Sequence, residues 1–126
     1  MTDAISAGSV LVVDDDRDLR EIVADVVEGS GRRVFTARDG TDALEQIEGT
    51  HLPRPCIVLL DWRMHPMAGG AFLERLSARH DAASFRVLLL SASSTAPPEG
   101  LSCAVVGVLR KPFGVDALLA ALDTHG

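Results

Sequence analysis

The feature of this sequence that most constrains its fold is an alternation between short apolar runs and segments with helical periodicity. Residues 9–14 (SVLVVD) and 56–61 (CIVLLD) are nearly unbroken apolar runs, which are typical of strands buried on both faces. Strands are predicted over residues 9–14, 33–37, 56–61, 86–91 and 104–109. Because helical segments separate them, we expect an α/β fold with a doubly wound, five-stranded parallel sheet and helices on both faces.

The helices are predicted from the spacing of apolar side chains. The first begins after Asp16, whose side chain can cap it, and ends near Gly29 and Gly31. Its apolar side chains have the spacing of one buried stripe and are Leu19, Ile22, Val23, Val26 and Val27. Helices are likewise expected around the apolar residues of segments 43–47, 72–76 and 115–122.

The segment between the fourth and fifth strands departs from this pattern. Residues 95–100 (TAPPEG) include Pro97, Pro98 and Gly100, which sustain no more than about one helical turn. A shortened or irregular fourth helix is therefore expected there. The chain has no linker, repeat or low-complexity tract, so we expect one domain over residues 1–126, with residues 1–8 as a flexible tail.

Charge and hydropathy narrow the classes of function. The formal net charge of −6 argues against a nucleic-acid surface, which needs clustered Lys and Arg side chains. No apolar run approaches the roughly 20 residues of a membrane span, and residues 1–8 lack the features of a secretion signal, so a soluble cytoplasmic protein is expected. Residues 1–61 carry 13 acidic and 6 basic side chains, so this half of the chain could supply ligands to a cation. Cys56 and Cys103 are interpreted as buried free thiols.

Polar side chains follow the predicted strands at one edge of the sheet, the carboxyl edge, where doubly wound proteins bind ligands. They are Asp14, Asp15 and Asp16 after the first strand, Asp61 after the third, Ser91 after the fourth, and Arg110 and Lys111 after the fifth. Clustered carboxylates suit Mg²⁺, and a carboxylate can attack phosphorus to give an aspartyl phosphate. A hydroxyl and an ammonium would neutralise the phosphoryl oxygens, so the pattern predicts a phosphoryl-transfer site.

Each of these residues also has a simpler interpretation. Asp14, Asp15 and Asp16 could form a solvated turn with a helix cap, and Asp61 could merely end a strand. Lys111 is harder to explain in this way, because it is the only lysine beside eleven arginines. Their joint occurrence at the ends of several strands favours a common site.

With these residues in place, the chain resembles the receiver domain of bacterial response regulators from Val10 to Leu122. The motifs that carry the resemblance are, in order, VLVVDDD, ARDGTDAL, IVLLDWRM, LLLSAS and RKPF. Each motif is weak alone, whereas five in order at the family's spacing are specific. The resemblance implies a flavodoxin-like fold with strand order 2-1-3-4-5.

The resemblance also implies a role for each acidic residue of the site. Asp61 would be the phosphoacceptor. Asp15 and Asp61 would bind Mg²⁺ directly, Asp14 would bind it through water, and Arg63 would contribute its backbone carbonyl.

The remaining family positions concern switching. Ser91 would be the switch hydroxyl, and Lys111 would pair with the phosphoryl oxygens and precede a cis bond to Pro112. Val108 stands where the family usually has an aromatic ring that swings inward. Phosphorylation is therefore expected to order the loop over residues 93–102 instead of moving a ring.

Three functions are compatible with these residues. The leading hypothesis is a phosphoacceptor signalling module, not a turnover enzyme, that is served by a histidine kinase or phosphotransfer protein and acts on an unidentified output protein. The alternative is a phosphorylation-independent pseudo-receiver that acts as an interaction domain, which Val108 and the Pro97-Pro98 segment favour and the intact acidic set opposes. An aspartate-nucleophile phosphatase would usually need an acid two residues after the nucleophile, where Arg63 stands.

Overall fold

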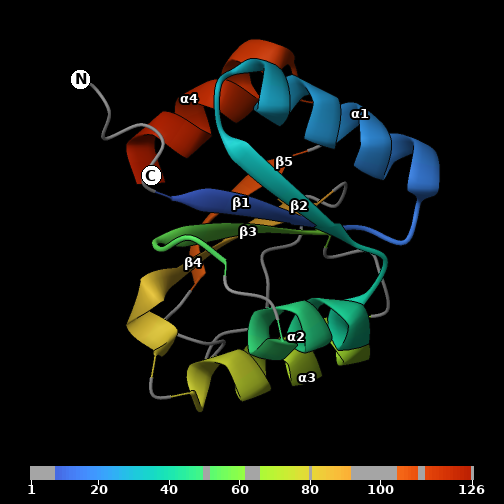
Figure 1. Ribbon diagram of the computed structural model, residues 1–126. Helices are drawn as coiled ribbons and strands as arrows, with labels where there is room; N and C mark the ends of the chain where they lie inside the picture. Colours follow the sequence, from blue (N-terminus) through green and yellow to red (C-terminus); the bar gives the residue numbers. More distant parts are fainter. Residues whose placement is uncertain are drawn as a thin grey trace.

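The computed structural model describes residues 8–49, 52–61, 66–79, 81–91, 105–110 and 113–125. At its centre is a parallel sheet in the order β2-β1-β3-β4-β5 (Figure 1). The strands are β1 (Ser9–Val13), β2 (Arg33–Ala37), β3 (Cys56–Asp61), β4 (Phe85–Ser91) and β5 (Val105–Arg110). The predicted α/β class, the five parallel strands and their order are therefore confirmed.

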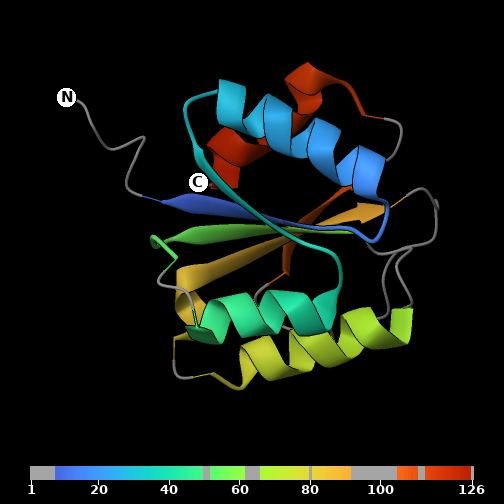
Figure 2. The same cartoon turned by 45° about the vertical axis from the view of Figure 1, so that its right-hand side comes forward.

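Helices cover both faces of this sheet. They are α1 (Arg17–Gly29), α2 (Gly40–Gly49), α3 (Pro66–Ser77) and α4 (Val115–His125), with a 3-10 turn at Ala82–Ser84. Figure 1 and Figure 2 show α1 and α4 on one face and α2 and α3 on the other. None of the described helices has both the length and the apolar character that a membrane crossing requires. The irregular helix expected near residues 95–100 and the loop over 93–102 lie outside the described residues.

The core consists of two apolar layers, one on each face of the sheet. All residues of β1 and β3 are buried, because each strand has a neighbour on both sides and helices above and below. Along β1, Leu11 and Val13 pack with side chains of α2 and α3, whereas Val10 and Val12 pack with those of α1 and α4. This burial on both faces explains why the sequence has unbroken apolar runs instead of an alternating pattern.

The first helix starts and ends as predicted. The carboxylate of Asp16 accepts a hydrogen bond from the backbone N–H of Leu19 at 3.2 Å, which caps α1. The helix ends at Gly29, and the chain then turns at Gly31 with a φ of 95°, a left-handed conformation that favours glycine.

The buried apolar stripe predicted on α1 is wrong at one position. Val23 and Val27 are buried, but Ile22 is 60% exposed. On α4, Val115 is likewise 52% exposed. A helix that rests on a sheet buries only part of its circumference, so the outer member of a wide apolar stripe stays exposed unless another element covers it.

The bounds of three strands differ from the prediction by one residue. β1 ends at Val13, β4 begins at Phe85, and β5 extends to Arg110. The pairing of β4 with β5 is irregular between Val87 and Leu88. Such an irregularity is common at an edge strand, and it shifts the register on which strand bounds depend.

The loops at the amino ends of β3 and β4 are joined by an ion cluster. The carboxylate of Asp81 accepts hydrogen bonds from Arg54 at 2.9 Å and from Arg79 at 2.7 Å. The Arg54 guanidinium also lies over the ring of Phe85, 4.4 Å from its centroid. Opposite charges therefore lie next to each other at this edge of the sheet, the amino edge.

One of the two cysteines lies in the described part of the chain. Cys56 is a buried free thiol at the start of β3, as expected. Burial raises the pKa of this thiol because it penalises the charged thiolate, so the group behaves as a small apolar side chain. Cys103 lies outside the described residues.

Candidate functional site

Three hydrogen bonds hold Asp14 in the turn between β1 and α1. Its backbone N–H donates to the carbonyl of Ala37 in β2 at 3.1 Å. Its carboxylate accepts from the N–H of Asp16 at 2.9 Å, and its carbonyl accepts from Nη1 of Arg20 at 2.8 Å. The Asp14 side chain is thus buried in a fixed position at the carboxyl edge, while Asp15, the next residue, is exposed.

Two further predicted residues end neighbouring strands at the same edge. Asp61 is the last residue of β3 and is fully buried, and Ser91 is the last residue of β4 and is 2% exposed. In the pairing of these strands, Asp61 lies opposite Leu90, so Ser91 extends one residue further towards the edge. A carboxylate and a hydroxyl therefore lie at adjacent strand ends, as the sequence predicts.

The carboxylates of Asp14, Asp15 and Asp61 come together at this edge. One oxygen from each lies within 4.8 Å of the other two. Two of the three side chains are buried and Asp15 is exposed, so the cluster has an open side towards solvent. Asp16 points its carboxylate at the start of α1 and acts as a cap.

The chemistry of these donors fits a small hard cation. Like charges at this separation repel one another strongly where burial reduces the screening by water. Carboxylate oxygens, with an open side for water or phosphate oxygens, are the ligands that Mg²⁺ prefers. Asp14, Asp15 and Asp61 could therefore hold Mg²⁺.

Some predicted residues cannot be placed in this way. Arg63, Lys111 and the Lys111–Pro112 bond lie outside the described residues. Val108 is described and is 45% exposed on β5. At the end of the same strand, Arg110 pairs in register with Ser91.

Arg20 lies near the site, although its sequence position did not predict a role there. It lies in the first turn of α1, and its side chain donates a hydrogen bond back to the carbonyl of Asp14. A hydrogen bond from a side chain to a backbone carbonyl leaves no pattern in a sequence beyond the spacing of the two residues. The spacing of six residues between Asp14 and Arg20 was therefore the only available signal.

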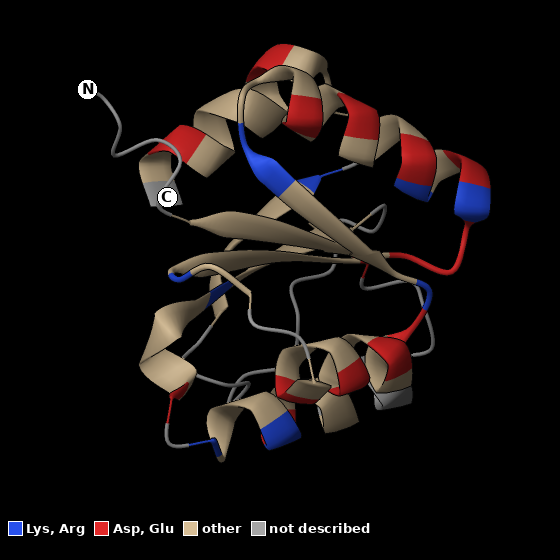
Figure 3. Cartoon of the chain, in the orientation of Figure 1, with Lys and Arg blue, Asp and Glu red and all other residues tan. Residues whose placement is uncertain are grey.

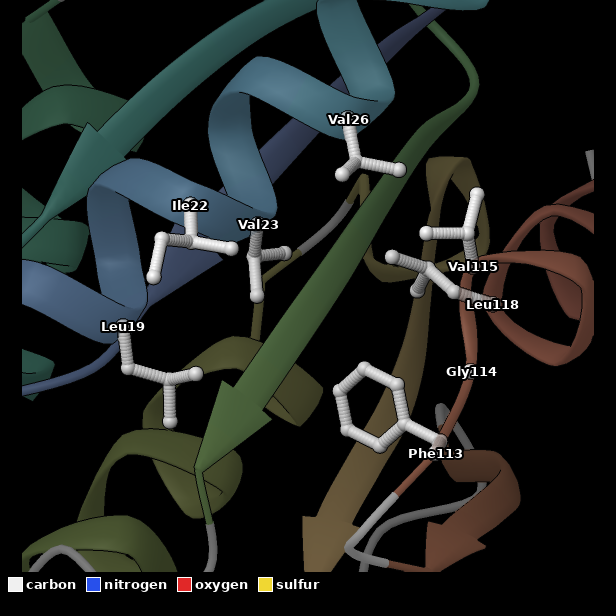
Figure 4. Close-up of a pocket in the computed structure, with 8 residues that line it drawn as sticks. All are labelled: Leu19, Ile22, Val23, Val26, Phe113, Gly114, Val115 and Leu118. Atoms are coloured by element: carbon white, nitrogen blue, oxygen red, sulfur yellow. The ribbon is translucent and has the colours of Figure 1, made fainter.

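A second missed feature is an apolar groove between α1 and the start of α4. Its volume is about 320 Å³. Figure 4 shows the side chains that line it, which are Leu19, Ile22, Val23, Val26, Phe113, Val115 and Leu118, together with Gly114. The groove begins near the carboxyl edge, because Leu19 is in the first turn of α1 and Phe113 follows the end of β5.

One margin of this groove is acidic. Four exposed acidic side chains follow α1 at helical spacing. They are Asp18, Glu21, Asp25 and Glu28. Figure 3 shows several red, acidic segments along that helix. Arg17 pairs with Glu21 at 2.8 Å, which leaves Asp18, Asp25 and Glu28 as net negative charge on α1. Asp18 and Asp25 are four and three residues from the exposed Ile22, so they lie beside it on the helix.

Comparison with known proteins identifies the family. The family model described as the response regulator receiver domain matches residues 10–123. The chain belongs to the response-regulator receiver family. Receiver domains are signalling domains of two-component systems that typically bind Mg²⁺ at an acidic pocket, and this chain has a cluster of three aspartates.

Relatives of known sequence or structure agree with this assignment. The receiver domain is 34% identical over 113 residues to the response regulator MprA of Mycobacterium ulcerans (strain Agy99), an alignment covering 90% of this chain and 47% of that protein. The chain thus spans about half the length of this relative. The chemotaxis response regulator CheY4 of Vibrio cholerae superimposes with a TM-score of 0.80 at 26% identity, over 94% of this chain and 98% of that one.

A further solved structure is that of the response regulator TrrA from Thermotoga maritima in complex with Mg(2+)-BeF. It superimposes on the receiver domain with a TM-score of 0.76 at 25% identity. The alignment covers 93% of this chain and 97% of that one.

Proposed function

We propose that this receiver domain accepts a phosphoryl group on Asp61, with Mg²⁺ bound by the neighbouring carboxylates, and that phosphorylation changes its binding to an output protein. The donor would be a cytoplasmic histidine kinase or phosphotransfer protein, and the domain would turn over no other substrate. The observation that carries the proposal is the convergence of Asp14, Asp15 and Asp61 within 4.8 Å at the carboxyl edge. The buried hydroxyl of Ser91 ends the adjacent strand.

The position of Asp61 in the sheet favours it as the acceptor. The strand order reverses between β1 and β3, because β1 leads to β2 on one side and β3 leads to β4 on the other. Doubly wound proteins bind ligands at this point, beyond the carboxyl ends of the strands. Asp61 ends β3 at this point, and its side chain is buried at the carboxyl edge.

The transfer itself would be a displacement at phosphorus. A carboxylate oxygen of Asp61 forms a bond to phosphorus while the bond from phosphorus to the donor's imidazole nitrogen breaks, and that nitrogen keeps the electron pair. The Ser91 hydroxyl would donate a hydrogen bond to one phosphoryl oxygen, and the Lys111 ammonium would pair with another. These two groups would couple the phosphoryl charge to the ends of β4 and β5.

Mg²⁺ would neutralise negative charge on the phosphoryl oxygens. Asp15 and Asp61 would bind it directly, Asp14 through water, and Arg63 through its backbone carbonyl. The fit of the three carboxylates to a hard cation supports this set. So does the similarity to TrrA, whose structure was solved in complex with Mg(2+)-BeF.

We place the docking of the phosphoryl donor at the groove between α1 and α4. The groove starts near the carboxyl edge that holds Asp61, and two of its residues, Ile22 and Val115, expose apolar surface. Its acidic margin on α1 selects a donor surface with an apolar ridge flanked by Lys or Arg side chains. A second copy of this chain would bring the same acidic margins together, which disfavours it as the occupant.

The docking proposal is tested by comparing a protein donor with a small one. Ile22→Asp should slow phosphoryl transfer from a phosphorylated kinase or phosphotransfer protein, and labelling by acetyl phosphate should stay unchanged. Equal rates from the protein donor would contradict the proposal. Concentration-dependent dimers that Ile22→Asp dissociates would assign the groove to a second copy instead.

One observation favours a second candidate function. Val108 exposes a short β-branched side chain on β5, and such a side chain cannot report phosphorylation by swinging a ring inward. A pseudo-receiver that binds its partner without phosphorylation would tolerate this residue. The two functions differ in whether the acidic cluster carries out chemistry.

Incubation with acetyl phosphate and Mg²⁺ distinguishes them. The wild-type protein should gain one base-labile phosphoryl group, detected by intact mass, and Asp61→Asn should gain none. Asp16→Asn is the matched control, because Asp16 caps α1, and it should be labelled like the wild type. An unlabelled wild-type protein would support the pseudo-receiver, and equal labelling of Asp61→Asn would remove Asp61 from the role.

A further inference from the structure

The peptide that joins Asp14 to Asp15 is held by one side chain from outside the acidic cluster. Nη1 of Arg20 donates a hydrogen bond of 2.8 Å to the carbonyl of Asp14. The carbonyl of Asp14 and the N–H of Asp15 belong to the same planar peptide unit. The Arg20 bond therefore fixes the plane from which the Cα and side chain of Asp15 project.

Both ends of this hydrogen bond are themselves anchored. The N–H of Asp14 is bonded to Ala37 in β2, and the N–H of Arg20 is bonded to the carbonyl of Asp16 at 2.9 Å in the first turn of α1. Asp15, by contrast, is exposed, and the described residues provide no hydrogen bond to its carboxylate. Its orientation thus depends on the backbone that carries it.

We infer that Arg20 is a positioning residue for the metal ligands, which it holds in place through the peptide between Asp14 and Asp15. The inference rests on the proposed Mg²⁺ site, because it concerns the geometry of that site. Mg²⁺ demands nearly ideal octahedral geometry, whereas Ca²⁺ accepts flexible and irregular coordination. Loss of the Arg20 bond should therefore weaken Mg²⁺ binding more than Ca²⁺ binding.

A purely electrostatic role of Arg20 would have the opposite sign. Removal of a cation near three carboxylates should strengthen the binding of another cation. Loss of positioning should weaken it, by about tenfold for residues that orient metal ligands. The direction of the change therefore separates the two roles.

Arg17 provides the matched control. It lies one turn earlier on α1, its side chain is 80% exposed, and it pairs with Glu21. Arg17→Met removes the same charge from the same helix without touching the Asp14 carbonyl. It should leave Mg²⁺ affinity unchanged or slightly increased.

The test is calorimetric titration of the full chain with Mg²⁺ and, separately, with Ca²⁺. Arg20→Met should weaken Mg²⁺ binding about tenfold and Ca²⁺ binding by less than about threefold. Arg20→Lys, which keeps a cationic donor, should recover part of the Mg²⁺ affinity. Unchanged or tighter Mg²⁺ binding by Arg20→Met, or an equal loss in Arg17→Met, would overturn the inference while leaving the Mg²⁺ site in place.

Amide hydrogen exchange without metal checks the structural step directly. Arg20→Met should accelerate exchange at Asp14 and Asp16, whose amides are bonded to the Ala37 carbonyl and to the Asp14 carboxylate, while the amides of β3 and β4 keep the protection that reports an intact fold. Unchanged exchange at Asp14 and Asp16 would contradict the anchoring role. A wild-type protein without measurable Mg²⁺ affinity would remove the proposed site, and this inference with it.

Discussion

The two edges of the sheet use the same kinds of charged residue in opposite ways. At the amino edge, Asp81 lies between Arg54 and Arg79 at distances of 2.9 and 2.7 Å, so positive and negative charges alternate. At the carboxyl edge, three carboxylates lie within 4.8 Å of one another. The first arrangement stabilises the fold by itself, whereas the second is suited to a cation that comes from solution.

The pairing of opposite charges at the amino edge also affects the pKa of the carboxyl group there. Hydrogen bonds from Arg79 and Arg54 hold the pKa of Asp81 far below its ordinary range. A carboxyl group with a lowered pKa stabilises the folded protein wherever it is ionised. We therefore expect the carboxyl edge, where like charges lie close together, to carry the function. We expect the amino edge, where opposite charges pair, to contribute to the stability of the fold.

The largest effect on stability is expected from Gly8→Ala at the amino edge. The Pro55 carbonyl oxygen accepts a hydrogen bond from Ser9 at 3.1 Å, and a Cβ on Gly8 would overlap that oxygen. The substitution should therefore lower the free energy of unfolding by about 1–3 kcal/mol, measured by urea denaturation. Gly29→Ala is the control, because a Cβ there meets no atom within 4 Å. A loss in the control as large as in Gly8→Ala would contradict the steric explanation.

A smaller loss is expected from Asp81→Asn. Removal of the charge that Arg54 and Arg79 share should cost about 1–2 kcal/mol of unfolding free energy at pH 7. Because the pKa of Asp81 is lowered in the folded state, its contribution is present above the unfolded pKa of about 4. The difference between wild type and variant should therefore shrink as the pH falls below about 4. A difference that is independent of pH would show that the ion cluster does not stabilise the fold.

The smallest effect, and one of opposite sign, is expected from Asp15→Asn at the carboxyl edge. Without metal, this substitution relieves repulsion and should leave stability unchanged or raise it by up to about 1 kcal/mol. With Mg²⁺, the wild type should gain stability and the variant should gain much less. Thermal unfolding with and without Mg²⁺ measures both, with Asp16→Asn as the control. A loss of stability in Asp15→Asn without metal would remove the contrast between the edges.

The sequence alone was enough to predict the central strands and the acidic cluster. β3 has the predicted bounds, because burial on both faces requires an unbroken apolar run. Asp14, Asp15 and Asp61 could be grouped because parallel strands end at one edge whatever the details of packing. Such inferences depend on periodicity and topology, which a single sequence records directly.

Features that depend on contacts between distant segments could not be predicted. The exposure of Ile22 and Val115 depends on how closely α1 and α4 approach each other, which the apolar spacing along each helix does not encode. The role of Arg20 depends on a bond to a backbone carbonyl, and that of Gly8 on the approach of Pro55 from another loop. In each case the contact is made with a backbone atom or with another helix or loop, so the type of the residue alone does not predict it.

The central claim, that the carboxyl edge takes a phosphoryl group on Asp61, is tested most directly by locating that group. Reduction of an aspartyl phosphate with borohydride gives homoserine, which peptide mass spectrometry assigns to one position. After incubation with acetyl phosphate and Mg²⁺, we expect homoserine at position 61 and unmodified aspartates at Asp14, Asp15 and Asp16. Homoserine at one of those three positions, or at none of the four, would contradict the account.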